Sequence, residues 1–137
     1  MIAVPKKILI VDDEQAIRQL VKMGLVNLGY DPECARNAKE ALSLLSREKF
    51  PLILMDLKLP GIDGIRLCME IKEKNPETVI YAFSGAVTED EFDELEKMGF
   101  DGLLCKPVSF EVLKRAIEGA FDKINNREKL STPFYSN

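Results

Sequence analysis

The sequence predicts an α/β protein in which a five-stranded parallel sheet carries helices on both faces. Five short apolar runs alternate with segments whose apolar residues recur at helical spacing. The strongest runs are continuously apolar, which is typical of strands buried on both faces. Strands that alternate with helices in this way form right-handed crossovers. We therefore expect a doubly wound (βα)5 fold with the common strand order 2-1-3-4-5.

Each predicted element has its own signal in the sequence. The apolar runs that predict strands are residues 8–11, 31–35 (the weakest), 52–55, 79–83 and 103–105. The helical patterns cover residues 17–28, 38–45, 65–74, 88–98 and 110–121. Asn37 and Ser109 precede two of these helices and are typical N-caps. Gly29 and Gly99 follow two others and are typical helix stops.

Length and composition indicate one domain with one core. The chain has 137 residues, of which 46% are hydrophobic. We expect the domain to span residues 1–126 and to be followed by a polar C-terminal tail at 127–137. The net charge of −4 argues against direct nucleic-acid binding. No apolar run is long enough to cross a bilayer, and the N-terminus lacks the features of a signal peptide.

Cysteine and histidine usage limits the chemistry further. The chain has three cysteines and none of the paired spacings typical of metal or redox sites, so we expect reduced thiols in a cytoplasmic protein. The chain has no histidine. Histidine metal ligands, histidine general bases and a phosphohistidine on this chain are therefore excluded.

Three acidic residues follow two of the predicted strands. Asp12 and Asp13 end the first strand, and Asp56 ends the third. In an open parallel sheet of this order, these strand ends meet at the point where ligands bind. Three carboxylates in one place raise one another's pKa values, and a hard divalent cation relieves that cost. The sequence therefore predicts a Mg²⁺ site that is completed by a phosphoryl group.

Two further strand ends supply groups that suit a phosphoryl oxygen. Ser84 follows the fourth strand with a hydroxyl, and Lys106 follows the fifth with an ammonium. An aspartate carboxylate can act as a nucleophile and form an acyl phosphate. Positioning and charge neutralisation supply most of the catalysis in phosphoryl transfer.

Four motifs in register resemble one family. VDDE, MDLKLPGIDG, FSG and CKP, in this order, are similar to the receiver domain of two-component response regulators, and the similarity runs from residue 6 to about 125. The resemblance implies a flavodoxin-like fold with Asp56 as the phosphoacceptor. It implies that Asp13, Asp56 and the backbone carbonyl of Lys58 bind Mg²⁺, with Asp12 acting mainly through water.

The same resemblance implies roles for the remaining site residues and a class of partner. Ser84 would bind the phosphoryl group, Lys106 would pair with it, and Lys106–Pro107 would be a cis peptide. The donor would be a phosphohistidine on a sensor histidine kinase or a histidine phosphotransfer protein. Such a domain is a signalling switch rather than a turnover enzyme, and it is a monomer or a phosphorylation-linked dimer.

One position departs from the family pattern. The family has Tyr or Phe three residues before the lysine, where this chain has Leu103; the nearest aromatic residue is Phe100. Coupling between Ser84 and an aromatic side chain is therefore altered. We expect the switch to act through Phe100, or through movement of the loop after Ser84.

Other interpretations remain open. Asp12 and Asp13 are also typical of helix N-cap acids. A haloacid-dehalogenase-type phosphohydrolase would need a DxD motif, and a flavodoxin-like flavin carrier would need a hydroxyl- and glycine-rich phosphate loop. A receiver that has lost phosphorylation would serve only as a docking module. The sequence leaves open whether the chain is a stand-alone receiver or part of a longer regulator, and does not identify the output.

Overall fold

The structure, a computed structural model, describes residues 5–85, 87–126 and 133–136. The strands are β1 (Lys7–Val11), β2 (Asp31–Ala35), β3 (Leu52–Asp56), β4 (Val79–Ser84), β5 (Gly102–Cys105) and β6 (Phe134–Tyr135). The helices are α1 (Gln15–Asn27), α2 (Ala38–Arg47), α3 (Gly64–Lys74), α4 (Glu89–Lys97) and α5 (Phe110–Asn126).

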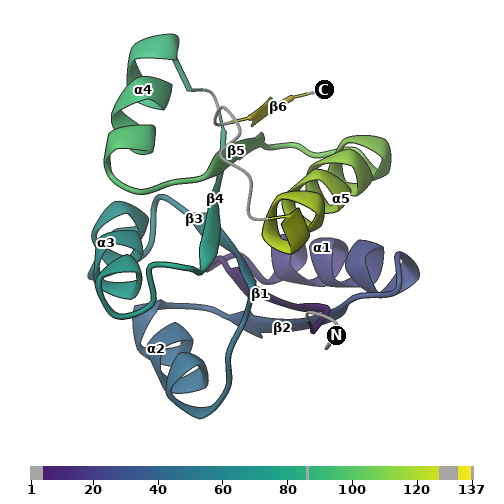
Figure 1. The fold of residues 1–137 in the computed structure, drawn as a ribbon, viewed down its shortest axis with the longest axis horizontal. Helices are drawn as coiled ribbons and strands as arrows, with labels where there is room; N and C mark the ends of the chain where they lie inside the picture. The colour runs from purple at the N-terminus through teal and green to yellow at the C-terminus, as the bar shows by residue number, and fades with distance from the viewer. Residues whose placement is uncertain (1–4, 86, 127–132, 137) are drawn as a thin grey trace.

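The strands form a single parallel sheet in the order β2-β1-β3-β4-β5-β6 (Figure 1). The predicted order 2-1-3-4-5 is therefore confirmed, with one additional strand beside β5. The chain places β2 on one side of β1 and β3 on the other, so the strand order reverses between β1 and β3. This reversal places the ends of β1 and β3 at the predicted ligand position.

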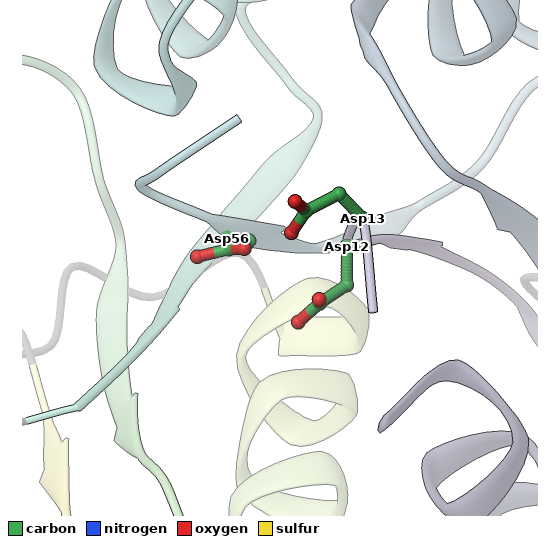
Figure 2. A group of neighbouring side chains, drawn as sticks. All are labelled: Asp12, Asp13 and Asp56. Carbon is green, nitrogen blue, oxygen red and sulfur yellow. The ribbon is translucent and has the colours of Figure 1, made fainter. Parts of the chain in front are cut away.

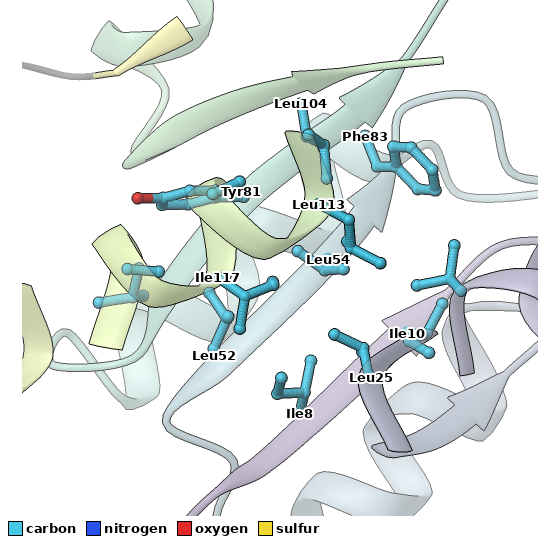
Figure 3. Packing of buried hydrophobic residues seen from close by; sticks show 14 of the residues in the cluster. Ile8, Ile10, Leu25, Leu52, Leu54, Tyr81, Phe83, Leu104, Leu113 and Ile117 are labelled. Carbon is cyan, nitrogen blue, oxygen red and sulfur yellow. The ribbon is translucent and has the colours of Figure 1, made fainter. Parts of the chain in front are cut away.

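Helices cover both faces of the sheet, and each face has its own hydrophobic core. Helices α1 and α5 lie on one face, and α2, α3 and α4 lie on the other (Figure 1). Figure 3 shows the first core, in which Leu25 of α1 and Ile117 of α5 pack on Ile10 and Leu54 of the sheet. None of the helices in the described residues has the length and apolar character needed to cross a bilayer.

The predicted helix caps are present. The Asn37 side chain accepts a hydrogen bond from the Glu40 N–H at 2.8 Å, and the Ser109 hydroxyl accepts one from the Val112 N–H at 3.2 Å. Thr88 and Glu91 form a reciprocal capping box at the start of α4. These bonds satisfy N–H groups that a helix start leaves without a partner.

The sixth strand was not predicted. Residues 127–132 and 137 of the expected polar tail lie outside the described residues, but Phe134 and Tyr135 pair with Leu103 and Leu104 of β5. The Leu103 N–H donates to the Pro133 carbonyl at 2.9 Å. Two apolar residues flanked by Ser, Thr and Pro show no periodicity, so no strand was predicted there.

Candidate functional site

The three predicted acids converge at one edge of the sheet. Val11 of β1 pairs with Met55 of β3, so Asp12 follows directly beside Asp56. Carboxylate oxygens of Asp12, Asp13 and Asp56 all lie within 4.8 Å of one another, and Figure 2 shows the three side chains grouped together. Residues 43 or more positions apart in the sequence thus meet because parallel strands end at the same edge.

Asp12 is the most deeply buried of the three acids, with no exposed surface. Its Oδ1 accepts a hydrogen bond from the Glu14 N–H at 2.9 Å, and its Oδ2 lies 2.7 Å from Lys106 Nζ. Apart from this ion pair, Oδ2 has no hydrogen-bond partner in the described part of the chain. The N-cap of α1 is Glu14, which makes no side-chain capping bond, so the N-cap interpretation of Asp12 and Asp13 is wrong.

Asp56 is 6% exposed and lies within reach of two donors. The Lys58 N–H donates to Asp56 Oδ1 at 3.1 Å, and Lys106 Nζ lies 3.7 Å from the same oxygen. Burial raises the pKa of Asp56 above its ordinary value of 3.8; the Lys58 N–H opposes this rise, and the charge of Asp12 adds to it. Asp56 is therefore an acid that lacks full compensation for its charge.

Lys106 links the acids to the neighbouring strand ends. Its ammonium lies 2.7 Å from Asp12 and 5.0 Å from the centroid of the Phe83 ring. Its backbone N–H donates to the Ser84 carbonyl at 2.6 Å, which joins the ends of β4 and β5. The Lys106–Pro107 peptide is cis, as predicted. The contact with Phe83 was not predicted, because the sequence pattern indicates only that this residue belongs to an apolar strand.

Gly64, the first residue of α3, packs against the main chain of Asp56. A Cβ at position 64 would overlap the carbonyl group of Asp56 and lie 2.9 Å from the Cα of Leu57. The Gly64 N–H also donates to the Leu57 carbonyl at 3.0 Å. Asp63 caps the helix by accepting a hydrogen bond from the Arg66 N–H at 2.9 Å. The start of α3 thus holds the backbone of Asp56 in place.

An open cavity of about 520 Å³ lies over these groups. Asp13, Asp56, Lys58, Ser84 and Lys106 all line it, so the structure brings the predicted site residues together. The rim also contains residues that the sequence analysis did not identify: Glu14, Leu57, Gly85, Val87 and Glu91. Some of them lie inside the quoted motifs, but nothing in the sequence assigned them a place at the cavity, and the fold brings them there.

The arrangement fits a hard divalent cation. Three carboxylates supply oxygen ligands at close range. Mg²⁺ prefers such oxygen ligands and retains several of its waters, for which the open cavity has room. The three cysteines are free thiols, as predicted.

The two predicted switch residues lie outside the cavity. Phe100 and Leu103 are 3% and 1% exposed, and both belong to the core beneath α2, α3 and α4. The side chain next to Leu103 across the sheet edge is Phe134 of β6, whose ring meets Phe92 of α4 edge to face at 5.4 Å. An aromatic side chain is thus present beside this position, but it comes from the added strand.

Comparisons with known proteins agree with this site. A family model described as the response regulator receiver domain matches residues 8–118. The response regulator protein PilR of Pseudomonas aeruginosa is 35% identical over 128 residues, which cover 93% of this chain and 28% of PilR. The autoinducer 1 sensor kinase/phosphatase LuxN of Vibrio campbellii is 36% identical over 116 residues, which cover 85% of this chain and 14% of LuxN.

Solved structures show the same fold. A CheY-like receiver domain protein from Methanospirillum hungatei superimposes with a TM-score of 0.84 at 30% identity, covering 91% of this chain and all of that one. The beryllofluoride-activated NtrC4 receiver domain dimer gives a TM-score of 0.81 at 32% identity, covering 87% and 98%. The chain spans less than a third of PilR and of LuxN. With these matches and the converging acids, the chain belongs to the response regulator receiver domain family.

Proposed function

We propose that this chain accepts a phosphoryl group on Asp56 from a partner phosphohistidine and that this changes its binding to an output partner. The observation that carries the proposal is the set of three carboxylate side chains within 4.8 Å, with the Lys106 ammonium 3.7 Å from Asp56. Such a set is costly without a ligand, and a metal ion with a phosphoryl group relieves the cost.

Phosphoryl transfer to Asp56 forms one bond and breaks another. An Asp56 carboxylate oxygen forms a bond to phosphorus while the N–P bond of the donor phosphohistidine breaks. The electron pair of that bond returns to the donor ring, which carries a proton on its other nitrogen and so leaves as neutral imidazole. The products are an aspartyl phosphate and a free histidine. Lys106 and the Ser84 hydroxyl are placed to bind phosphoryl oxygens, because both line the cavity beside Asp56.

Mg²⁺ fits the acidic cluster and would supply positive charge to the phosphoryl oxygens. We propose that Asp13, Asp56 and the Lys58 carbonyl hold the ion, and that Asp12 acts mainly through a water. The burial of Asp12 supports an indirect role, since its Oδ2 is already 2.7 Å from Lys106.

The donor must approach from the cavity side, and an apolar surface lies next to it. Leu20 and Met23 of α1 are 60% and 66% exposed, and Phe110, at the start of α5 four residues after Lys106, is 46% exposed. These three side chains also border a cavity of about 210 Å³ between α1 and α5. We propose that the surface formed by Leu20, Met23 and Phe110 contacts the protein that carries the phosphohistidine.

The remaining assignments follow the family. We propose that residues 1–126 form the receiver domain and that 127–137 is an extension. We propose that switching passes through Phe100, Leu103 and the loop after Ser84, and that the chain is cytoplasmic and a monomer or a phosphorylation-linked dimer. The NtrC4 receiver is described as a beryllofluoride-activated dimer, which supports the last assignment.

The decisive experiment is intact mass after incubation with acetyl phosphate, with and without Mg²⁺, on the native chain and on Asp56→Asn. We expect a Mg²⁺-dependent gain of one phosphoryl group that is absent from Asp56→Asn. A folded native chain that gains no mass and ignores beryllofluoride would instead be a docking module.

Met23→Glu tests the proposed donor surface separately. Acetyl phosphate is too small to need that surface, so Met23→Glu should gain mass from acetyl phosphate at the native rate. Transfer from a phosphorylated histidine phosphotransfer protein should slow by at least about tenfold, as expected for loss of an interface anchor. Equal rates from both donors in the variant would show that the donor binds elsewhere.

A further inference from the structure

The outer edge of β5 is occupied by the C-terminal segment of the chain. In the described residues β5 pairs with β4 on one side and with β6 on the other (Figure 1). Without β6, β5 would be an edge strand with unpaired backbone groups, including the Leu103 N–H that now donates to the Pro133 carbonyl. The segment 133–136 is therefore the ligand of a strand-binding site on the same molecule.

Tyr135 fits a specific place on the α5 side of the sheet. Its ring stacks on that of Tyr81 with centroids 6.2 Å apart and an interplanar angle of 23°. Burial, and after it the charge of Tyr135, raises the pKa of Tyr81. The Tyr135 hydroxyl lies beside Gly119 of α5, where an added Cβ would come within 2.5 Å of it. A glycine inside a helix lowers helix stability, so its presence here is explained by the room that it leaves for the hydroxyl.

Phe134 contacts the other side of the sheet less completely. It meets Phe92 of α4 edge to face at 5.4 Å, but 45% of its surface remains exposed. The paired strand has only two residues. A short, partly exposed strand opens at a low free-energy cost compared with the core strands. The segment thus docks at a specific place but with low stability.

The strands that β6 contacts are the ones that end in the phosphoryl-binding groups. β5 pairs directly with β6 and is followed by Lys106, and β4 carries Tyr81 and ends in Ser84. The two ends are joined by the hydrogen bond from the Lys106 N–H to the Ser84 carbonyl. A phosphoryl group on Asp56 would attract Lys106, which is now closer to Asp12, and so would shift the end of β5.

We propose that β6 is a displaceable latch on the β5 edge and that phosphoryl binding at Asp56 weakens its docking. The latch keeps the strand edge and the adjoining α4 and α5 surfaces covered until the site is occupied. This inference rests on the proposed function for its trigger, although the docking of β6 stands without it. Coupling between two sites is reciprocal, so loss of the latch must strengthen binding at the Asp56 site by the same factor.

Gly119→Ala tests the latch without harming the domain. Alanine favours the helix, but its Cβ would collide with the Tyr135 hydroxyl and displace β6. Tyr135→Phe removes that hydroxyl, so the double variant Gly119→Ala/Tyr135→Phe should recover docking. This double variant is the matched control, because it carries the same change in α5.

Hydrogen exchange of the Leu103 amide reports docking directly. We expect protection in the native chain, at least about tenfold faster exchange in Gly119→Ala, and restored protection in the double variant. If Gly119→Ala exchanges at the native rate, the fit between Tyr135 and Gly119 does not hold β6 and the latch is refuted.

Beryllofluoride with Mg²⁺, a mimic of the phosphoryl group, then tests the coupling. We expect it to speed Leu103 exchange in the native chain, and we expect Gly119→Ala to bind it at least about fivefold more tightly than the double variant does. Unchanged exchange on binding, with equal affinities, would refute the coupling. If beryllofluoride does not bind at all, the proposed function fails and the coupling fails with it, while the docking result from the variants stands by itself.

Discussion

Two clusters, each made of three carboxylates and one lysine, lie at opposite ends of the sheet. The site cluster at the carboxyl ends of the strands consists of Asp12, Asp13, Asp56 and Lys106. The rear cluster at the amino ends consists of Lys7, Asp31, Glu33 and Glu48. Their residue types are nearly the same, and yet their charges are compensated in different ways.

The difference lies in how each cluster compensates its excess negative charge. Lys7 lies 2.8 Å from Glu48 and 3.3 Å from Asp31, and all three side chains are at least 31% exposed. A hydrogen bond with Glu48 raises the pKa of Glu33, and burial raises it further, so a proton is retained there more readily. The rear cluster thus offsets most of its charge with its own lysine and with solvent, and its remaining oxygen without a partner among the described residues, Glu33 Oε2, belongs to the acid whose pKa is raised.

The site cluster has no comparable relief. Asp12 is fully buried, and its ion pair with Lys106 leaves Asp56 at 3.7 Å from that ammonium. Burial raises the pKa of Asp56, which means that the folded state holds this charge at a cost. A buried charge that faces a cavity without full compensation, rather than the number of acids, distinguishes a ligand site from a structural cluster.

The largest expected effect comes from exchanging the two lysines for methionine, one at a time. Lys106→Met should slow phosphoryl uptake from acetyl phosphate by at least about tenfold, because a positioned positive charge is lost from the transfer site. Lys7→Met should leave the rate unchanged, since that lysine lies at the far end of the sheet. Intact mass measured over time gives both rates, and equal slowing would erase the functional distinction between the clusters.

The effect of Mg²⁺ on thermal stability should depend on the site cluster and not on the rear cluster. A ligand that binds only the folded state stabilises it, by about 2.7 kcal/mol at a concentration one hundred times its dissociation constant. Mg²⁺ should therefore raise the melting temperature of the native chain by several degrees. Asp13→Asn should lose most of this rise, and Glu48→Gln in the rear cluster should keep it. A thermal melt that ignores Mg²⁺ in the native chain would contradict the proposed cation site.

A smaller effect should appear in the pH dependence of stability without Mg²⁺. The folded-state pKa of Asp56 is raised, so folding strengthens proton binding there, and stability falls as the pH rises through that pKa. Asp56→Asn cannot carry this charge. It should melt above the native chain at neutral pH, and the gap should close as the pH falls through the raised pKa. A gap that widens toward acid would mean that the charge of Asp56 stabilises the fold.

The smallest effect is expected in the rear cluster itself. Glu33→Gln mimics the protonated form that the cluster favours, so it should change the free energy of unfolding by only about 0.5 kcal/mol or less at neutral pH. Because the pKa of Glu33 is also raised, the stability of the native chain should decline as the pH rises through that pKa. Glu33→Gln cannot titrate there, so its stability should not show this decline. Chemical denaturation at several pH values would measure both, and a large loss would show that ionised Glu33 supports the fold.

The site could be predicted from the sequence because its residues lie at the ends of recognisable strands. Asp12, Asp56 and Lys106 each follow an apolar run, and a parallel sheet brings such positions to one edge. The pattern was less informative wherever a contact depends on packing alone. Phe83 beneath Lys106 and the fit of Tyr135 against Gly119 leave no periodic signal, because they depend on distances that only the folded chain defines.

The segment from Asp56 to the first residue of α3 contains two glycines that the structure requires for different reasons. Gly61 has a φ of +85°, and nothing lies within 4 Å of the Cβ that it lacks. Gly64 does not have a positive φ, but the Asp56 main chain occupies the space that a Cβ at this position would need. During sequence drift, position 61 is open to asparagine, which tolerates that backbone conformation. Position 64 is closed to every other side chain, so glycine there should persist for as long as Asp56 keeps its place.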